Sequence, residues 1–277
     1  MSGPCCLSGS VDTDAVQLGT ERTLGGVDVY WAPQPATKSC VAMIVVTDVF
    51  GWKLPNARLL ADSVSNKLGV TAIVPDIFRG GACNPECMQH IFALTDPKMG
   101  ASFGQKCGSF CSLLYNFVPF LLQQSHAAGA AVIKQVIAAL QAQDPTITQI
   151  VLAGYCWGGH IAIKLSQDET IKGLTAIYAA HAGGLKIPQD YQLIRRPACI
   201  VIAGLDFEVK AAAQEQIKDT MEAVKDRVIS QVHVVADVHH GFAMRGSNTD
   251  PVVREKRLEA EQFLADWIRQ TCTFQGQ

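Results

Sequence analysis

The segment GYCWG at residues 154–158 places Cys156 between two glycines, in the pattern Gly-x-nucleophile-x-Gly. The apolar run ITQIVLAG ends at residue 154, and GHIAIKLSQ, whose apolar residues have helical spacing, follows at 159–167. A sharp strand-to-helix turn presents a nucleophile on a strained backbone, and only small residues two positions away leave room for it. The amino-terminal end of the helix also favours a thiolate. We therefore interpret Cys156 as a nucleophile rather than as an incidental cysteine in a glycine-rich turn.

A nucleophile at such a turn needs a histidine base and an acid that orients it, and the acid precedes the histidine along the chain. Asp206 ends one apolar run, ACIVIAGLD, and His239 and His240 follow another, QVHVVAD. Both positions lie just past the expected carboxyl end of a strand, where the functional groups of open parallel sheets gather. Glu208 competes with Asp206 as the acid, and the residues alone do not decide between His239 and His240.

Strand-like and helix-like segments alternate along the chain and must position these groups. Their continuous apolar runs are typical of strands covered on both faces. The alternation predicts a mostly parallel sheet flanked by helices on both faces. Gly69 is expected to end one helix, and Pro251 to lie in the first turn of another. The expected strands are 27–32, 40–48, 70–76, 147–154, 171–180, 198–206 and 231–237, and the expected helices are 54–69, 128–143, 159–167, 210–226 and 251–270.

We expect residues 1–277 to form a single domain that begins with an N-terminal extension at 1–24. Neither an internal repeat nor a linker of biased composition divides the chain. Residues 77–128 are rich in Gly, Cys and Pro and show few clear periods. An irregular excursion with one or two short helices is therefore expected there, and it could act as a lid.

The composition argues against several classes of protein. Hydrophobic residues make up 48% of the chain, so a large core can form. The net charge is −2 and no basic stripe is present, which argues against nucleic acid as a partner. The segment FCSLLYNFVPFLLQQ, which starts at Phe110, is interrupted by Asn116 and Pro119 and is too short to span a membrane. Because the N-terminus also lacks the pattern of a signal peptide, we expect a cytoplasmic protein without a membrane partner.

The ten cysteines are expected to be reduced thiols, since the sequence has no secretory signal. Cys83 with Cys87 and Cys107 with Cys111 form two Cys-x3-Cys pairs. Their spacing departs from the gap that is usual in zinc sites, so free thiols in a loop-rich segment are the favoured interpretation. The phosphate-binding patterns of nucleotide and dinucleotide sites are missing as well. We therefore expect neither a metal nor a cofactor.

Five short motifs, TDVFGW, VPDIFRG, GYCWGG, LDFEV and HHGFAMRG, together resemble the dienelactone hydrolase (carboxymethylenebutenolidase) family. The resemblance extends over about residues 25–270 and is strongest to the eukaryotic branch of the family. It implies an α/β-hydrolase-type fold with three layers, a Cys-Asp-His triad and no cofactor. It assigns Cys156 as the nucleophile, His240 rather than His239 as the base, and Asp206 as the orienting acid.

The resemblance also implies how the thiol and the reacting carbonyl are held. Asp48 stands at the position of an acid that contacts the resting thiol, where the bacterial members carry a glutamate one methylene longer. The oxyanion hole of the family corresponds to the backbone N–H groups of Val49 and Trp157. A protonated resting thiol would be less prone to oxidation.

Three further residues are expected to bind substrate. Arg245 lies near the position of one of two arginines that hold the substrate carboxylate in bacterial members, five residues after His240 rather than four. We find no counterpart of the other arginine in residues 77–128, which argues against dienelactone itself as the substrate. His181, which follows an expected strand, and Phe50, in the TDVFGW motif, are expected to line the pocket.

The expected reaction is hydrolysis of an ester or lactone bond of a small molecule through a thioacyl-enzyme, by a monomer or a homodimer. A thiol esterase or thioesterase of broad specificity is an alternative, as is a non-catalytic receptor or scaffold for small molecules with the hydrolase fold. A third is the glutamine-amidotransferase type, which pairs its histidine with a glutamate two residues later. Here that position is Phe242, which argues against this third class.

Overall fold

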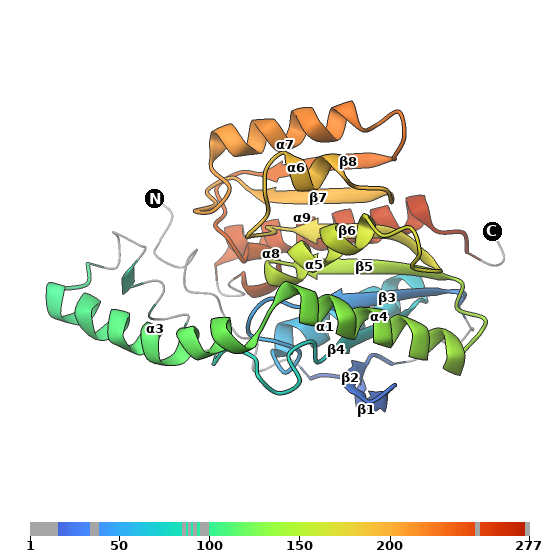
Figure 1. The fold of residues 1–277 in the computed structure, drawn as a ribbon, viewed down its shortest axis with the longest axis horizontal. Coiled ribbons are helices and arrows are strands. Elements are labelled where there is room, and N and C mark those ends of the chain that lie inside the picture. The colour runs from blue at the N-terminus through green and yellow to red at the C-terminus, as the bar shows by residue number, and fades with distance from the viewer. Residues whose placement is uncertain are drawn as a thin grey trace.

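An eight-stranded sheet organises the part of the chain that the computed structural model describes, which is residues 16–33, 39–84, 87, 90, 93–94, 100–246 and 250–274. The strand order is β1-β2-β4-β3-β5-β6-β7-β8 (Figure 1). The two pairings of β2 are antiparallel and the pairings from β4 to β8 are parallel, which confirms the predicted, mostly parallel sheet. The strands are β1 Thr20–Leu24, β2 Val27–Trp31, β3 Val41–Val46, β4 Thr71–Pro75, β5 Gln149–Tyr155, β6 Leu174–Ala180, β7 Ala198–Ala203 and β8 Ser230–Val235.

Helices cover both faces of this sheet (Figure 1). One face packs against α1, α8 and α9, and the other against α4, α5, α6 and α7, so the molecule has the three layers that the sequence predicts. The helices are α1 Pro55–Leu68, α3 Phe103–Gln123, α4 His126–Gln143, α5 Trp157–Ser166, α6 Gln189–Gln192, α7 Ala211–Ala223, α8 Phe242–Arg245 and α9 Pro251–Thr271.

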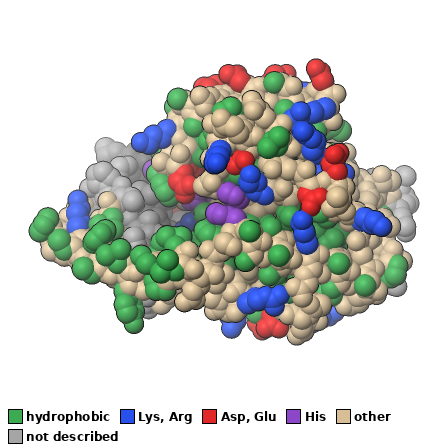
Figure 2. Space-filling view, viewed as in Figure 1, with side chains coloured by type: hydrophobic (Ala, Val, Ile, Leu, Met, Phe, Trp, Pro, Cys, Tyr) green, Lys and Arg blue, Asp and Glu red, His purple; other side chains and the backbone are tan. Residues whose placement is uncertain are grey.

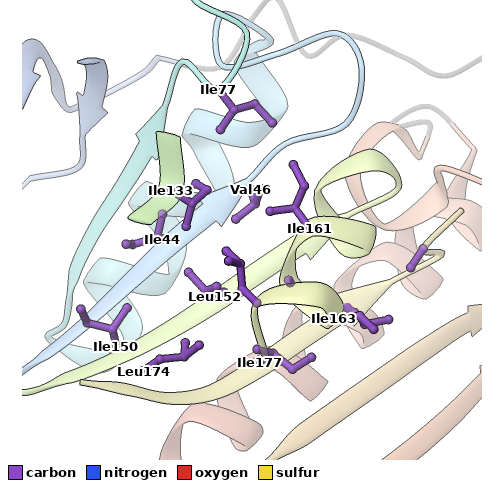
Figure 3. Close-up of a cluster of buried hydrophobic side chains, with 14 of the residues drawn as sticks. Ile44, Val46, Ile77, Ile133, Ile150, Leu152, Ile161, Ile163, Leu174 and Ile177 are labelled. Carbon is purple, nitrogen blue, oxygen red and sulfur yellow. The ribbon is translucent and has the colours of Figure 1, made fainter. Parts of the chain in front are cut away.

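The side chains of β3 show why its sequence is apolar without interruption. Ala42, Ile44 and Val46 pack on the side of α4 and α5, while Val41 and Met43 pack on the opposite side. Figure 3 shows the first of these clusters between the sheet and its helices. Because each fully buried aliphatic side chain contributes about 1.5–3 kcal/mol, the double layer fixes the central strands firmly.

The predicted helix ends at Gly69 and Pro251 are confirmed. Gly69 ends α1 with a left-handed φ of 65°, and its N–H donates to the Ser65 carbonyl at 2.8 Å. Pro251 lies in the first turn of α9, where its missing N–H costs nothing. The structure adds a cap that we did not predict, since Asp250 accepts hydrogen bonds from the N–H groups of Val252 and Val253.

The first strand lies in the segment that we expected to be an N-terminal extension. Residues 20–24 form β1, which pairs with β2 across a turn at Gly25 and Gly26, whose φ angles are 56° and 78°. Two successive residues with positive φ match the turn that joins antiparallel strands best. Most of β1 is exposed, so its sequence TERTL carries no hydrophobic pattern that predicts a strand.

A long helix, α3, occupies much of the segment 77–128 in which we expected irregular structure. Its first turn is closed by Ser102 and Gln105, which cap each other reciprocally. Figure 2 shows hydrophobic side chains gathered over this projecting helix. Within the described ranges, no helix, α3 included, is both long and apolar enough to cross a membrane. The exposed large apolar residues of α3 are Phe103, Phe110, Leu114, Tyr115, Val118, Leu121 and Leu122.

Candidate active site

Cys156 lies at the sharp turn between β5 and α5, and its backbone φ of 52° is unusual for a residue other than glycine. Its N–H donates to the Ala180 carbonyl of the neighbouring strand at 3.1 Å, which holds the turn in place. A Cβ atom on Gly154 would lie 2.3 Å from the Gly158 carbonyl oxygen, and one on Gly158 would lie 1.9 Å from the Val46 carbonyl oxygen. Any side chain at either position would collide with these backbone oxygens, so both positions of the motif require glycine.

His240 and Asp206 meet at the carboxyl edge of the sheet. The Nδ1 atom of His240 lies 3.1 and 3.0 Å from the two carboxylate oxygens of Asp206. Their side chains are only 5% and 0% exposed, so water does not weaken the contact. The carboxylate also accepts the Glu208 N–H at 2.9 Å and the Val209 N–H at 3.4 Å. These bonds hold Asp206 rigidly and therefore orient the imidazole.

His239 and Glu208, the alternatives for the base and the acid, make other contacts. The Nδ1 atom of His239 is 3.2 Å from the Leu205 carbonyl oxygen, in an exposed contact. The Glu208 carboxylate accepts the Gly184 N–H at 3.0 Å. The pair that contains a carboxylate and a buried imidazole is thus Asp206 with His240.

The charge state of His240 depends on its neighbours. Burial alone would lower its pKa, but the charge of the Cys156 sulfur and the hydrogen bond to Asp206 outweigh that effect. They hold the pKa of His240 well above its usual value, which favours the imidazolium form of this histidine. The Nε2 atom is buried and has no hydrogen-bond partner of standard geometry among the described residues.

Asp48 and Arg245 form a buried ion pair close to this edge. The Nε atom of Arg245 donates to Asp48 at 2.8 Å, and their side chains are 9% and 1% exposed. The second carboxylate oxygen of Asp48 accepts the Phe50 N–H at 3.0 Å. The guanidinium of Arg245 lies 5.0 Å from the centre of the Phe50 ring. Asp48 makes no hydrogen bond to Cys156 in the described part of the chain, so in this arrangement its partner is the arginine.

Val49 and Trp157, the two expected oxyanion donors, follow β3 and begin α5 respectively. Val49 follows β3, and its carbonyl accepts the Cys83 N–H at 2.8 Å, which braces the loop. Trp157 is the first residue of α5, where backbone N–H groups have no partner within the helix. The helix itself therefore makes no use of the Trp157 N–H.

The indole of Trp157 packs in a cluster of rings that the sequence did not predict. Its centre lies 6.2 Å from the Phe78 ring, 5.2 Å from the Phe120 ring and 3.7 Å from the His126 ring, which it stacks upon. His126 stacks in turn on His160 at 3.7 Å. Phe120 and His126 lie at the junction of α3 and α4, far from Trp157 in sequence, so no local pattern could have revealed the contact.

His181 follows β6 and contacts the ring of His240 at 5.1 Å. It is only 1% exposed, and neither ring nitrogen has a hydrogen-bond partner in the described structure. Of the three expected pocket residues, Phe50 and Arg245 thus contact each other, while His181 contacts the catalytic candidate His240.

The cysteine pairs differ in their surroundings. Cys83 and Cys87 are buried, and burial together with a hydrogen bond to Cys87 raises the pKa of Cys83 far above its usual value. Cys107 and Cys111 are exposed on α3. Among the residues that the structure describes, no group of three or more His, Cys, Asp or Glu side chains could hold a metal ion.

The strand order, the sharp turn at Cys156 and the carboxylate–histidine pair at later strand ends define the class of α/β hydrolases. Residues 27–274 match the model of the dienelactone hydrolase family. The chain therefore belongs to that family and is a dienelactone hydrolase-like hydrolase.

Relatives and solved structures agree with this assignment. The carboxymethylenebutenolidase homologue of Homo sapiens is 25% identical over 258 residues, which cover 91% of this chain and 90% of that protein. The homologue of Xenopus tropicalis is 24% identical, with 96% and 95% covered. The expected resemblance to eukaryotic members is thus confirmed.

The solved structures support the fold. The dienelactone hydrolase of Anabaena variabilis superposes with a TM-score of 0.58 at 12% identity, covering 92% of this chain and 97% of that one. A Xanthomonas campestris protein described as an α/β serine hydrolase without lid gives a TM-score of 0.55 at 15% identity, with 92% and 96% covered. At these identities the likeness concerns the fold alone.

Proposed function

We propose that the protein hydrolyses an ester or lactone bond of a small molecule through a thioacyl-enzyme on Cys156. The observation that carries the proposal is the buried His240–Asp206 pair, 3.0 Å apart, in a position where Cys156 raises the pKa of the histidine. A paired imidazolium stabilises a thiolate, and the thiolate is the reactive form of cysteine.

In the proposed first half-reaction, the Cys156 thiolate, paired with the imidazolium of His240, attacks the carbonyl carbon. The oxyanion accepts hydrogen bonds from the N–H groups of Val49 and Trp157, and a donor of this type contributes about 3 kcal/mol. The tetrahedral intermediate collapses as the carbon–oxygen bond of the leaving group breaks, and His240 Nε2 gives its proton to the departing alkoxide. The products are an alcohol and a thioester on Cys156.

In the second half-reaction His240 takes a proton from water, and the resulting hydroxide attacks the thioester carbonyl. Collapse of this intermediate breaks the carbon–sulfur bond, releases the acid and restores the thiolate–imidazolium pair. Throughout the cycle Asp206 fixes the tautomer of His240 and stabilises its charged form.

We propose that Asp48 and Arg245 tune the thiol in the resting enzyme. Asp48 can approach the sulfur of Cys156 only after it releases Arg245, since the two form a buried ion pair. A negatively charged substrate group that binds Arg245 would compete with Asp48 for the guanidinium. Binding and thiol activation would then be linked through a single ion pair.

The test uses the variants Cys156→Ala and His240→Ala with a panel of p-nitrophenyl esters, acyl thioesters and lactones. Each variant should lower kcat at least about 1,000-fold, because nucleophile and base act as one unit. Circular dichroism should show that both variants are folded. The Tm of Cys156→Ala should match that of the wild type, whereas His240→Ala leaves the buried Asp206 carboxylate without its partner and should have a lower Tm. The profile over the panel distinguishes a lactone or ester hydrolase from a thioesterase. Undiminished hydrolysis by Cys156→Ala would refute the scheme.

A further inference from the structure

His181 occupies a strained position directly beside the sharp turn that carries Cys156. Its φ is 39°, and its N–H donates to the Val201 carbonyl at 2.7 Å. The preceding residue, Ala180, accepts the hydrogen bond from the Cys156 N–H. Positive φ on a residue other than glycine costs free energy, and such strain is concentrated at functional sites.

The side chain of His181 is a second anomaly at the same position. It is 1% exposed and packs against the rings of Tyr155, Phe242 and His240 at 6.0, 5.9 and 5.1 Å. Neither nitrogen has a partner among the described residues. A phenylalanine of similar size would fill this space without burying unsatisfied polar atoms. Packing alone therefore gives no reason for a histidine here.

The two histidines differ in charge. Burial lowers the pKa of His181 well below its usual value, and the positive charges of His240 and Arg245 lower it further. His240 has the opposite shift, so the pair holds one proton, on His240. The titratable groups that face the pair are Tyr155, Cys156, Asp206 and Arg245.

Two rings of the described residues lie beside the ring of His240. Phe207, which is 53% exposed, lies 5.0 Å away, and His181 lies 5.1 Å away. Asp206 holds the His240 Nδ1 atom, and the tilt of the ring about this contact also depends on the two rings beside it. A neutral imidazole on the buried side can restrain that tilt and can turn its lone pair toward a cation.

We propose that His181 is a positioning residue: its neutral imidazole holds the His240 ring on the buried side and stabilises the imidazolium form of His240. The proposal rests on the proposed role of His240 as the base. It predicts that His181 lowers the free energy of unfolding, while it orients His240 and keeps it protonated.

The test compares His181→Phe, which keeps the ring but removes its polarity, with His181→Gln, which restores a neutral polar group. For a p-nitrophenyl ester, His181→Phe should lower kcat roughly ten-fold with KM changed less than about two-fold. The alkaline limb of its pH–rate profile should move to lower pH, because the imidazolium of His240 loses a stabilising neighbour. His181→Gln should recover part of both effects.

Stability separates a positioning role from a merely structural one. The Tm of His181→Phe should equal or exceed that of the wild type, because an unsatisfied polar group leaves the core. Tyr155→Phe is the matched control, since it likewise removes a buried polar group without a hydrogen-bond partner, the Tyr155 hydroxyl next to His181. Its Tm should equal or exceed that of the wild type for the same reason, while its kcat and pH profile should be those of the wild type.

A readout without turnover keeps this proposal separate from the proposed function. Iodoacetate is attracted by the imidazolium, whereas iodoacetamide is not, so the ratio of their alkylation rates at Cys156 falls as His240 loses its proton. Mass spectrometry of the peptide that contains Cys156 measures both rates. In His181→Phe the fall should occur at lower pH than in the wild type, even if no ester in the panel is hydrolysed.

Two results would overturn the proposal. One is a His181→Phe variant with the kcat, pH profile and alkylation ratio of the wild type. The other is a loss of kcat that is accompanied by a lower Tm and is not relieved in His181→Gln, which would indicate packing only. If His181→Phe does not fold, His181→Gln decides: wild-type stability with a shifted alkaline limb supports the role, and an unshifted limb overturns it.

Discussion

Strain in single residues is concentrated at one edge of the sheet. In the described part of the chain, the residues other than glycine with positive φ are Arg79, Cys156, His181 and Asp237, at 50°, 52°, 39° and 60°. They follow β4, β5, β6 and β8, so all lie near the carboxyl ends of parallel strands. This is the edge at which open α/β sheets bind their ligands, and the strain there is consistent with a site that is held in a fixed geometry.

Gly158 provides a prediction at this scale. In Gly158→Ala the new Cβ would lie 1.9 Å from the Val46 carbonyl oxygen, a backbone atom that cannot move without disturbing β3. We expect a loss of at least about 3 kcal/mol in the free energy of unfolding. Urea denaturation measures it.

Gly108→Ala is the matched control, since a Cβ at Gly108 in α3 meets no atom within 4 Å. Its free energy of unfolding should rise by about 0.5–1 kcal/mol, because alanine favours the helix more than glycine does. Equal stability of the two variants would contradict the close packing inferred at the turn.

Among the elements, α3 has two contrasting sides. Phe120 is buried and contacts both Phe78 and Trp157 at 5.2 Å, whereas Leu122 is 82% exposed. The helix thus reaches the wall of the candidate site with one residue and presents apolar residues to the outside with others.

This contrast predicts the effects of two truncations. Phe120→Ala should lower the free energy of unfolding by about 3–5 kcal/mol and should also raise KM, because Trp157 loses its support. Leu122→Ala should change the free energy of unfolding by less than about 0.5 kcal/mol. Thermal melts and steady-state kinetics check both variants. If Leu122→Ala were as destabilising as Phe120→Ala, the exposed side of α3 would have to be covered.

The elements differ in how well their sequences predicted them. The central strands were predictable because burial on both faces leaves uninterrupted apolar runs such as VAMIVV in β3. The helix α3 could not be predicted in this way. Its exposed side is as apolar as its buried side, so its apolar residues show no helical period. The edge strand β1 is polar and exposed, so its pairing with β2 depends on the turn at Gly25 and Gly26.

For the molecule as a whole, the candidate site combines groups that are far apart in sequence. The order of nucleophile, acid and histidine predicted that Cys156, Asp206 and His240 would be neighbours, since parallel strands end at one edge. The ion pair between Asp48 and Arg245 was not predictable, because 197 residues separate them and only the folded chain fixes their distance.

The buried neutral histidines predict that acid destabilises the whole protein. Burial lowers the pKa of His126 to about 4, with help from the charge of His160, and burial also lowers the pKa values of His160 and His181. Below about pH 6.5 these histidines take up protons in the unfolded chain but not in the folded one. The free energy of unfolding therefore decreases as the pH is lowered. The stability contribution of His240, whose pKa is raised, is fully present in that range and is lost only as pH rises through its folded-state pKa.

In thermal melts the Tm of the wild type should therefore decrease as the pH is lowered from 7 to 4. The interval ends at pH 4 because the pKa of His126 is about 4, so folded His126 also takes up a proton there. His126→Phe keeps a ring that can stack on Trp157 but does not titrate, so its Tm should fall less over the same interval. A wild-type Tm that stays constant over this interval would contradict the neutral state of these histidines.

The most direct test of the central claim is to detect the acyl group on the nucleophile. The protein is mixed with a p-nitrophenyl ester that deacylates slowly, quenched within the first turnover and digested, and the peptide that contains Cys156 is analysed by mass spectrometry. We predict one acyl increment on Cys156, formed at the rate of the p-nitrophenol burst and missing from Cys156→Ala. A burst of p-nitrophenol with an unmodified Cys156 would contradict the assignment of this residue as the nucleophile.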